Sequence, residues 1–258
     1  ISVRAALDTA SVGTVDVVLI VTKSTDTRAA AESSRALIGA STLVLSLQNG
    51  LGNLEAIAEV VGAERSLLGM TYVGATVVAP ARVRLTAPGV TFVGVPTAGT
   101  PAPRVVSLAR TLSDAGLPTE STDRVWPMIW GKLVINAALN ATCALTGANG
   151  TTALECAAIS HWLGLVADET AAVAAAAGIE LPYADAAERV RRHCLAVGAS
   201  KPSMLQDIER GRPTEIEAIN GAVVREGQRL GVPTPCNQAL LLLVKGRQEV
   251  ARGAAVLA

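Results

Sequence analysis

Hydrophobic positions in the first 122 residues follow the pattern of strands that alternate with helices. Continuous β-branched and aliphatic runs over 14–22 and 41–47 predict two buried parallel strands. Helical spacing over 26–39 and 51–62, each ending at a glycine, predicts the helices that follow them. This order indicates βαβ units. Further strands are expected over 67–78, 83–85, 90–95 and 119–122, and a further helix over 103–115, with prolines between the middle strands that permit an antiparallel arrangement there.

After about residue 123 the pattern changes to helical spacing alone. Glycine and proline separate the apolar stretches, as expected for loops between helices. Helices are predicted over 125–145, 154–177, 183–197, 202–210, 215–230 and 236–251. The sequence therefore predicts two domains, an α/β domain over 1–123 and an all-helical domain over 124–258.

Composition narrows the class of protein. Half of the 258 residues are hydrophobic, which excludes intrinsic disorder, and the net charge of zero with no basic run argues against nucleic-acid binding. The longest continuous apolar stretches are far shorter than a membrane span requires. The four cysteines are widely spaced without a Cys-x-x-Cys pair, which favours buried reduced thiols over disulfides or a metal site. We therefore expect a cytoplasmic protein without membrane or nucleic-acid partners.

A polar stripe on one predicted helix is the sharpest candidate for chemistry. Only four of the 22 basic residues are lysines, so a lysine in an apolar helix is unusual in this chain. Lys132, Asn136 and Asn140 are spaced by four, which places them on one helix face. A solvated face is the simpler explanation. The strongly apolar surroundings favour a stripe that lines a cleft.

Other candidates have structural explanations of equal weight. Lys23 directly follows the first strand, where ligands bind in open α/β sheets, but a solvated lysine is as good an interpretation. The loop 48–52 joins a strand to a helix and would face the same crevice. Ser203 could cap a helix, and Glu215 could lie in the first turn of one that starts at 213 or 214. We interpret the two histidines, His161 and His193, as ordinary helix residues.

Taken together, these segments resemble the ketopantoate reductases (2-dehydropantoate 2-reductases). The matching motifs are VTK at Lys23, QNGLG at Asn49, WGKLVINAALNATCAL around Lys132, SMLQDIERGRPTEIEAINGAVV from Ser203, and GVPTPCNQ near the end. They occur in the order of the family and span almost the whole chain. The resemblance implies a Rossmann-like dinucleotide-binding domain followed by a helical domain for substrate binding and dimerisation.

The activity implied by the resemblance is NADPH-dependent reduction of 2-dehydropantoate to pantoate, in pantothenate and coenzyme A biosynthesis. Lys132 corresponds to the catalytic lysine and Glu215 to its partner carboxylate. The substrate-binding residues implied are Asn136, Asn140, Ser203 and Asn49, and those near the cofactor are Lys23, Asn49 and Glu215. The expected partners are NADP, a small 2-keto acid and a second copy of the chain.

One departure from the family leaves alternatives open. Its members begin with a strand and a G-x-G-x-x-G loop that binds the cofactor pyrophosphate, and this sequence starts beyond that point, so its dinucleotide-binding domain is incomplete as given. Either those residues lie upstream of Ile1 or half of the cofactor site has been lost. The competing functions are a related 2-keto-acid reductase with another substrate, and a truncated non-catalytic relative that binds a small acid or a partner.

Overall fold

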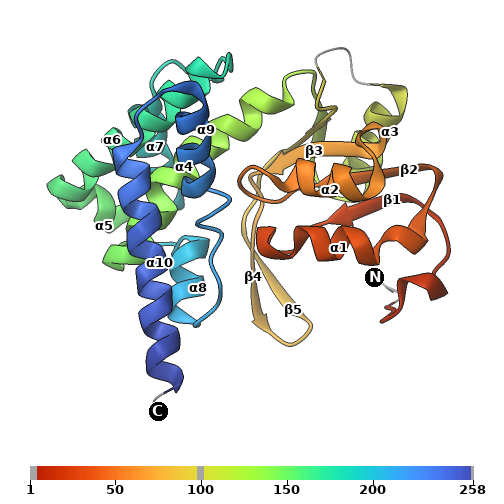
Figure 1. Ribbon diagram of the computed structural model, residues 1–258, viewed down its shortest axis with the longest axis horizontal. Helices are drawn as coiled ribbons and strands as arrows, with labels where there is room; N and C mark the ends of the chain where they lie inside the picture. Colours follow the sequence, from red (N-terminus) through yellow and green to blue (C-terminus); the bar gives the residue numbers. More distant parts are fainter. Residues whose placement is uncertain (1–4, 98–101, 257–258) are drawn as a thin grey trace. The chain divides into compact units, whose positions relative to one another are not determined.

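The computed structural model describes residues 5–97 and 102–256, with side chains to residue 251. The chain divides into two compact units. The first contains Ile1–Gln48 and Gly52–Val125, and the second contains Asn49–Leu51 and Trp126–Ala258. The first unit contains a mixed, mainly parallel sheet covered by helices, and the second is helical. This confirms the predicted order of a Rossmann-like domain followed by an all-helical domain. Figure 1 shows the elements of each unit.

A five-stranded sheet forms the centre of the first unit. Its strands are β1 (Val15–Ile20), β2 (Ile38–Ser46), β3 (Ser66–Thr71), β6 (Thr91–Gly94) and β7 (Thr119–Ser121), in that spatial order. β1, β2 and β3 are parallel, β6 is antiparallel to β3, and β7 is parallel to β6. The predicted strand over 67–78 is in fact two strands. β4 (Gly74–Ala79) leaves the main sheet and pairs antiparallel with β5 (Arg82–Ala87).

Helices cover both faces of this sheet. α1 (Thr27–Ser33) and α2 (Asn53–Val61) pack on one face, where Val44 and Ile57 belong to the same buried cluster. α3 (Pro103–Asp114) packs on the other face, where Leu45 and Val105 are buried together. Because neighbouring residues of β2 point to opposite faces, a continuous apolar run suits this strand.

The edge strand β1 departs from the prediction of a strand buried on both faces. Val18 and Ile20 are buried beneath α1 and α2, but Leu19 on the other face is 43% exposed. In the described residues β1 pairs with β2 alone, so its second edge has no neighbouring strand. The helix predicted over 26–39 ends early, at Ser33. Ile38 and Gly39, which were predicted to end this helix, instead begin β2.

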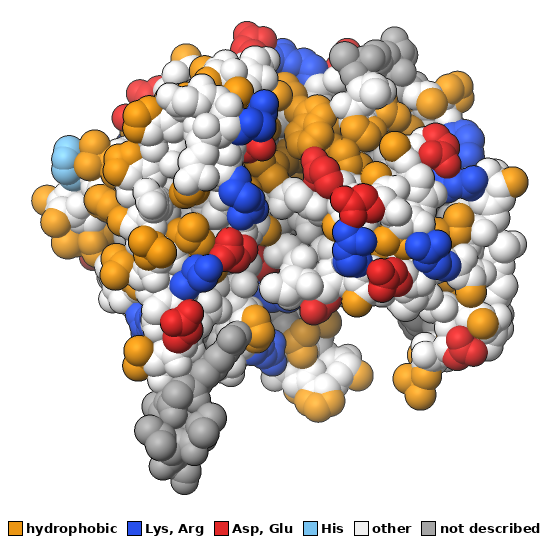
Figure 2. Space-filling model, in the orientation of Figure 1, with side chains coloured by type: hydrophobic (Ala, Val, Ile, Leu, Met, Phe, Trp, Pro, Cys, Tyr) orange, Lys and Arg blue, Asp and Glu red, His pale blue; other side chains and the backbone are white. Residues whose placement is uncertain are grey.

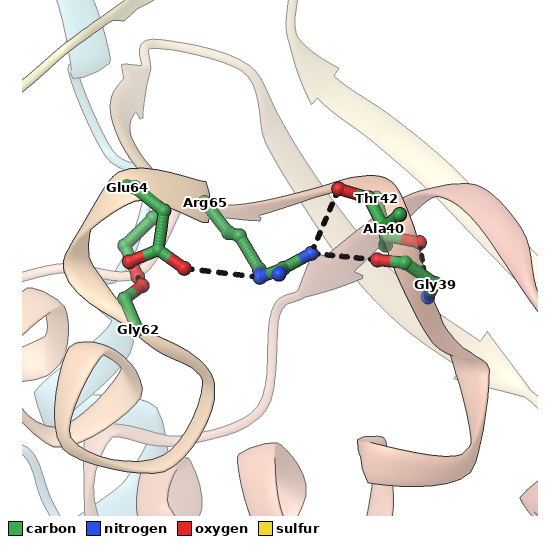
Figure 3. Close-up of polar contacts among 7 residues, drawn as sticks. Gly39, Ala40, Thr42, Gly62, Glu64 and Arg65 are labelled. Atoms are coloured by element: carbon green, nitrogen blue, oxygen red, sulfur yellow. Dashed lines mark hydrogen bonds and ion pairs between the residues drawn. The ribbon is translucent and has the colours of Figure 1, made fainter.

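Arg65 fixes the start of β2. It lies at the end of a short 3-10 helix, and its guanidinium donates hydrogen bonds to the carbonyl oxygens of Gly39 at 2.6 Å and Ala40 at 3.1 Å, as Figure 3 shows. Glu64 pairs with the same guanidinium at 3.2 Å. The backbone of β2 is thus held at the amino end, opposite the end at which ligands bind in open α/β sheets.

Seven helices make up the second unit. They are α4 (Val125–Thr146), α5 (Gly150–Glu155), α6 (Ala157–Ala176), α7 (Ala186–Val197), α8 (Ser203–Glu209), α9 (Asn220–Leu230) and α10 (Pro235–Val256), whose described residues include no strand. The helix predicted over 154–177 is broken at Cys156, whose extended backbone separates α5 from α6. Cys156 is exposed, contrary to the prediction, whereas Cys143 and Cys194 are buried.

α4 is the core helix of this unit. It is long and apolar enough to cross a membrane, but 83% of its most apolar 18-residue stretch is buried inside the fold. Val134, Ala138 and Ala141 are fully buried against the other helices. Its hydrophobic character therefore belongs to the core. On the face of the molecule in Figure 2, acidic and basic side chains are interspersed rather than segregated.

Candidate active site

The polar stripe on α4 is buried together with the apolar residues around it. Asn136 and Asn140 are only 9% and 7% exposed, and Lys132 is partly buried one turn earlier. This rules out the solvated face that was the simpler explanation. Amide and ammonium groups are costly to bury, so their presence in the core helix points to a binding role.

Lys132 has the electrostatic environment of a proton donor. Burial lowers the pKa of its ammonium from the usual 10.5 to about 8, because the charged form loses solvent. The Glu215 carboxylate opposes this shift and stabilises the charged form. Glu215 is itself only 7% exposed. The two residues therefore form a buried charge pair in which the lysine can lose a proton near neutral pH.

The sequence predicted that Glu215 could lie in the first turn of a helix, and the structure contradicts this. α9 begins only at Asn220, and Ile219 before it has φ −99° and ψ −90°, outside helical values. Glu215 instead opens a separate turn, in which the amides of Ala218 and Ile219 donate to its carbonyl oxygen at 3.1 and 3.0 Å. The helix dipole of α9 therefore does not explain this carboxylate.

The loop after β2 brings Asn49 to the same turn. Asn49–Leu51 group with the helical unit, and the Leu51 amide donates to the Ala218 carbonyl at 2.8 Å. Gly50 has φ +83°, and a Cβ there would lie 2.3 Å from the Ala218 oxygen. Only glycine allows both this backbone conformation and this close approach. Asn49 and Glu215 are thus held by one local structure.

The other predicted residues lie elsewhere. Lys23 belongs to the first unit, where its carbonyl accepts from the Asp26 amide at 2.9 Å. It lies beyond Val21 and Thr22, because β1 ends at Ile20 rather than at residue 22 as predicted. Nearby, the Gln48 side-chain amide donates to the Thr22 carbonyl and to the Thr27 hydroxyl, both at 2.8 Å, which ties the ends of β1 and β2. Ser203 is exposed and is the first residue of α8, not its cap, since Pro202 occupies the cap position.

His193 lies within the electrostatic influence of Lys132, although its sequence context indicates no more than an ordinary helix residue. It lies on α7, and burial together with the positive charges of Arg189 and Lys132 lowers its pKa to about 4. His193 is therefore neutral near pH 7 and faces the electrostatic field of Lys132. Its spacing in the sequence is that of any helix residue, so no pattern could have revealed this position. Among the described residues, no group of three or more His, Cys, Asp and Glu could hold a metal ion.

The chemistry available in the helical unit is proton donation beside hydrogen-bonding amides. Lys132 can donate a proton to an oxygen that becomes negative, and Glu215 holds it in the charged form. Asn136 and Asn140 offer both donors and acceptors to the polar groups of a small ligand. The electron donor for a reduction has to come from a bound cofactor.

Comparison with known proteins identifies the family of the chain. Residues 1–97 match the family model described as "Ketopantoate reductase PanE/ApbA", and residues 124–248 match "Ketopantoate reductase PanE/ApbA C terminal". The 2-dehydropantoate 2-reductase of Aquifex aeolicus is 32% identical over 238 residues, which cover 90% of this chain and 76% of the relative. That of Archaeoglobus fulgidus is 34% identical over 231 residues, with the same coverage.

Solved structures give the same result. A PanE/ApbA family ketopantoate reductase from Ralstonia eutropha JMP134 is 32% identical, with a TM-score of 0.88 over 97% of this chain and 81% of that chain. A D-mandelate dehydrogenase bound to NADH and anilino(oxo)acetate is 30% identical, with a TM-score of 0.85 over 93% and 78%. The chain therefore belongs to the ketopantoate reductase PanE/ApbA family, whose members are NAD(P)-dependent reductases of 2-keto acids.

Proposed function

We propose that this protein reduces 2-dehydropantoate (ketopantoate) to pantoate with NADPH, as a step of pantothenate and coenzyme A biosynthesis. The observation that carries the proposal is the buried pair of Lys132 and Glu215, with the pKa of Lys132 lowered to about 8. A general acid works best when its pKa lies near the operating pH, and this lysine meets that condition. The 2-dehydropantoate reductases among the relatives support the choice of substrate.

Lys132 acts on the keto oxygen of the substrate. Its ammonium donates a hydrogen bond to that oxygen and releases a proton to it as negative charge develops. A bound reduced nicotinamide supplies the hydride to the keto carbon. Glu215 keeps Lys132 charged until the proton moves, and water returns a proton to the amine afterwards. Hydride and proton together balance the reduction of the ketone to an alcohol.

Asn136 and Asn140 hold the remainder of the substrate. They lie one and two turns beyond Lys132 on the same buried face, within reach of an extended small molecule. Asn49 and Ser203 complete the proposed contacts, with Ser203 at the substrate carboxylate. Ser203 is exposed at the start of α8, so its hydroxyl can donate a hydrogen bond to a carboxylate.

The described residues fit a nicotinamide cofactor in part. Lys23 stands at the carboxyl end of β1, and the loop before α2 brings Gly52 with φ +91° to the helix start, where backbone amides can face an anion. Lys23, Asn49 and Glu215 are the proposed cofactor contacts. The preference for NADPH over NADH is part of the proposal, because the related D-mandelate dehydrogenase binds NADH.

A second candidate activity is reduction of an aryl 2-keto acid, favoured by the similarity to D-mandelate dehydrogenase. Oxidation of NADPH and NADH should be followed with ketopantoate and with benzoylformate, the keto acid that corresponds to mandelate. We expect the highest kcat/KM for NADPH with ketopantoate. A higher value with benzoylformate would identify the second activity. Tight binding of either acid without turnover would instead indicate a non-catalytic relative. Lys132→Met protein, prepared in the same way, is the control for activity from contaminating reductases of the expression host.

The domain roles and the oligomeric state are also proposals. Residues 1–123 would bind the dinucleotide, and residues 124–258 would bind substrate and form a homodimer. Light scattering on the purified protein tests the second of these, since a monomer at assay concentration would contradict it.

A further inference from the structure

A buried hydrogen-bond chain connects three helices to the turn that carries Glu215. Asn220 is the first residue of α9, and its side-chain amide donates to the Ala137 carbonyl of α4 at 3.1 Å and to Asn237 Oδ1 at 2.9 Å. Asn220 and Asn237 are both fully buried. The chain therefore lies inside the core, where hydrogen bonds fix the orientation of buried amides. Both amide hydrogens of Asn220 are used in it, whereas its Oδ1 has no hydrogen-bond partner among the described residues.

Glu169 fixes the orientation of Asn237. Its carboxylate accepts from the Cys236 and Asn237 backbone amides at 2.9 and 2.8 Å, at the start of α10, and from Asn237 Nδ2 at 2.8 Å. Thr170 Oγ1 accepts from the same Nδ2 at 3.2 Å. Since both amide hydrogens are used, Asn237 can present only its oxygen to Asn220. A flipped amide would face Asn220 with a second donor.

The contact from Asn220 reaches the helix that bears Lys132. Ala137 lies next to Asn136 and five residues after Lys132 on α4. On the other side, the Gly221 amide donates to the Ile216 carbonyl at 2.9 Å, so the start of α9 is continuous with the turn that holds Glu215. Asn220 thus links the turn to α4 by a hydrogen bond, beside the apolar contacts of Ile216 and Ile219 in the same buried cluster.

We propose that Asn220 is a positioning residue, oriented by Asn237 and Glu169, that holds the Glu215 turn against α4 and thereby sets the separation of Glu215 from Lys132. Asn220 and Asn237 lie in motifs that carry the family resemblance, but the sequence predicted no role for them or for Glu169. The inference rests on the proposed catalytic pair, but not on the identity of the substrate. It assigns the ING and TPCN segments of the chain to the geometry of the pair rather than to ligand contact.

The pKa of Lys132 reports this separation without any substrate. The chain has only four lysines, so ¹³C,¹⁵N-lysine labelling gives four side-chain NMR signals, and Lys132→Met assigns the one of interest. Glu215→Gln removes the supporting charge and sets the direction of change, which is a further fall in the pKa. We expect Asn220→Ala to lower the pKa of Lys132 in the same direction by a smaller amount, and Asn237→Ser to lower it less than Asn220→Ala.

Two controls separate positioning from general loss of stability. Val244→Ala and Val173→Ala create cavities in the same helical core without removing any member of the hydrogen-bond chain. Whichever matches the Tm of Asn220→Ala should leave the pKa of Lys132 unchanged. An unchanged pKa in Asn220→Ala, an equal fall in the matched control, or a rise toward the value of a solvated lysine would each overturn the proposal.

Folding failure does not prevent a decision. Asn220→Ser is the milder replacement if Asn220→Ala precipitates. If neither folds, Asn237→Ser decides alone, and a wild-type pKa in that variant overturns the proposal. If the wild-type protein does not reduce ketopantoate, the proposed substrate is wrong. The pKa test of Asn220 still applies, because it uses no substrate.

Discussion

Two glutamates of the same turn, Glu215 and Glu217, each interact with a lysine, and the two pairs differ mainly in burial. Glu215 is buried and supports the charge of Lys132 inside the core. Glu217, two residues on, is 53% exposed, and its carboxylate meets Lys245 at 2.6 Å and Arg225 at 3.4 Å on the surface. Burial lowers the pKa of Lys132, whereas the hydrogen bond and charge of Glu217 raise the pKa of Lys245.

The comparison shows what a charge pair does in each setting. At the surface, solvent already stabilises both ions, and such a pair adds about 0–1 kcal/mol at most. In the core, the partner carboxylate offsets only part of the desolvation, so the lysine releases its proton more readily. The same two residue types therefore give a surface contact in one place and, in the other, a buried lysine that we propose as the proton donor.

The largest expected difference is between Lys132→Met and Lys245→Met. Loss of a general acid should lower kcat by about 10²–10⁴-fold in Lys132→Met. The free energy of unfolding reflects two opposed changes, because the substitution removes a desolvated ammonium but leaves the buried Glu215 carboxylate without its counter-charge. Steady-state kinetics and urea unfolding measure the two effects. Lys245→Met should keep wild-type kcat, and a loss of activity there would contradict the distinction.

A smaller effect is expected when the carboxylates are neutralised. Glu215→Gln should lower the pKa of Lys132 further. For each unit by which this pKa falls, kcat/KM at pH 8 should fall by up to about tenfold. Its free energy of unfolding should change far less than its activity. Glu217→Gln is the matched control and should be nearly neutral in kinetics. Equal kinetic effects of the two substitutions would show that burial does not decide the roles.

The pH dependence sharpens the comparison further. Because Lys132 must be protonated to act, kcat/KM should decline above about pH 8, roughly tenfold per pH unit. The unfolded chain keeps this proton up to a pKa of 10.5, whereas the native protein releases it at about 8. The unfolded state thus binds more protons in between, so the free energy of unfolding rises with pH across that window. The difference between wild type and Lys132→Met isolates this contribution, and identical pH profiles would contradict it.

The smallest effects should come from the amides of the stripe. Asn136→Ala and Asn140→Ala each remove a hydrogen bond of about 0.5–1.5 kcal/mol to the substrate, which corresponds to a rise in KM of roughly twofold to tenfold. The protonation step should be little affected, so kcat should change less than KM. Thr146→Ala, on the exposed end of the same helix, should leave both constants unchanged. A fall in kcat alone would place these amides at the reacting atoms.

The sequence predicted the stripe because helical periodicity is local. Once α4 forms, the spacing of four residues dictates that Lys132, Asn136 and Asn140 share a face. The strongly apolar neighbours then predict that this face is buried, and it is. The order of strands and helices was predictable for the same reason, since each pattern depends only on near neighbours along the chain.

Features that depend on distant parts of the chain were not predictable. The acidic residues after Pro213 fit a helix start locally, but the burial of Ile216 and Ile219 accompanies a separate turn before α9. The edge position of β1 depends on which strands pair with it, and the apolar run over 14–22 contains no information on that. The proximity of His193 to Lys132 likewise results from the packing of two helices far apart in sequence.

The placement of the proposed substrate-binding stripe on the core helix has a consequence for mutational tolerance. The three residues of the stripe are interspersed among the apolar positions of the same 22 residues. In a library of substitutions across 125–146, selection for solubility and selection for growth that depends on the enzyme making its product would agree at the apolar positions and conflict at 132, 136 and 140. Hydrophobic replacements at those three sites would accumulate under the first selection and disappear under the second. A consensus drawn from stabilised variants alone would therefore erase the stripe.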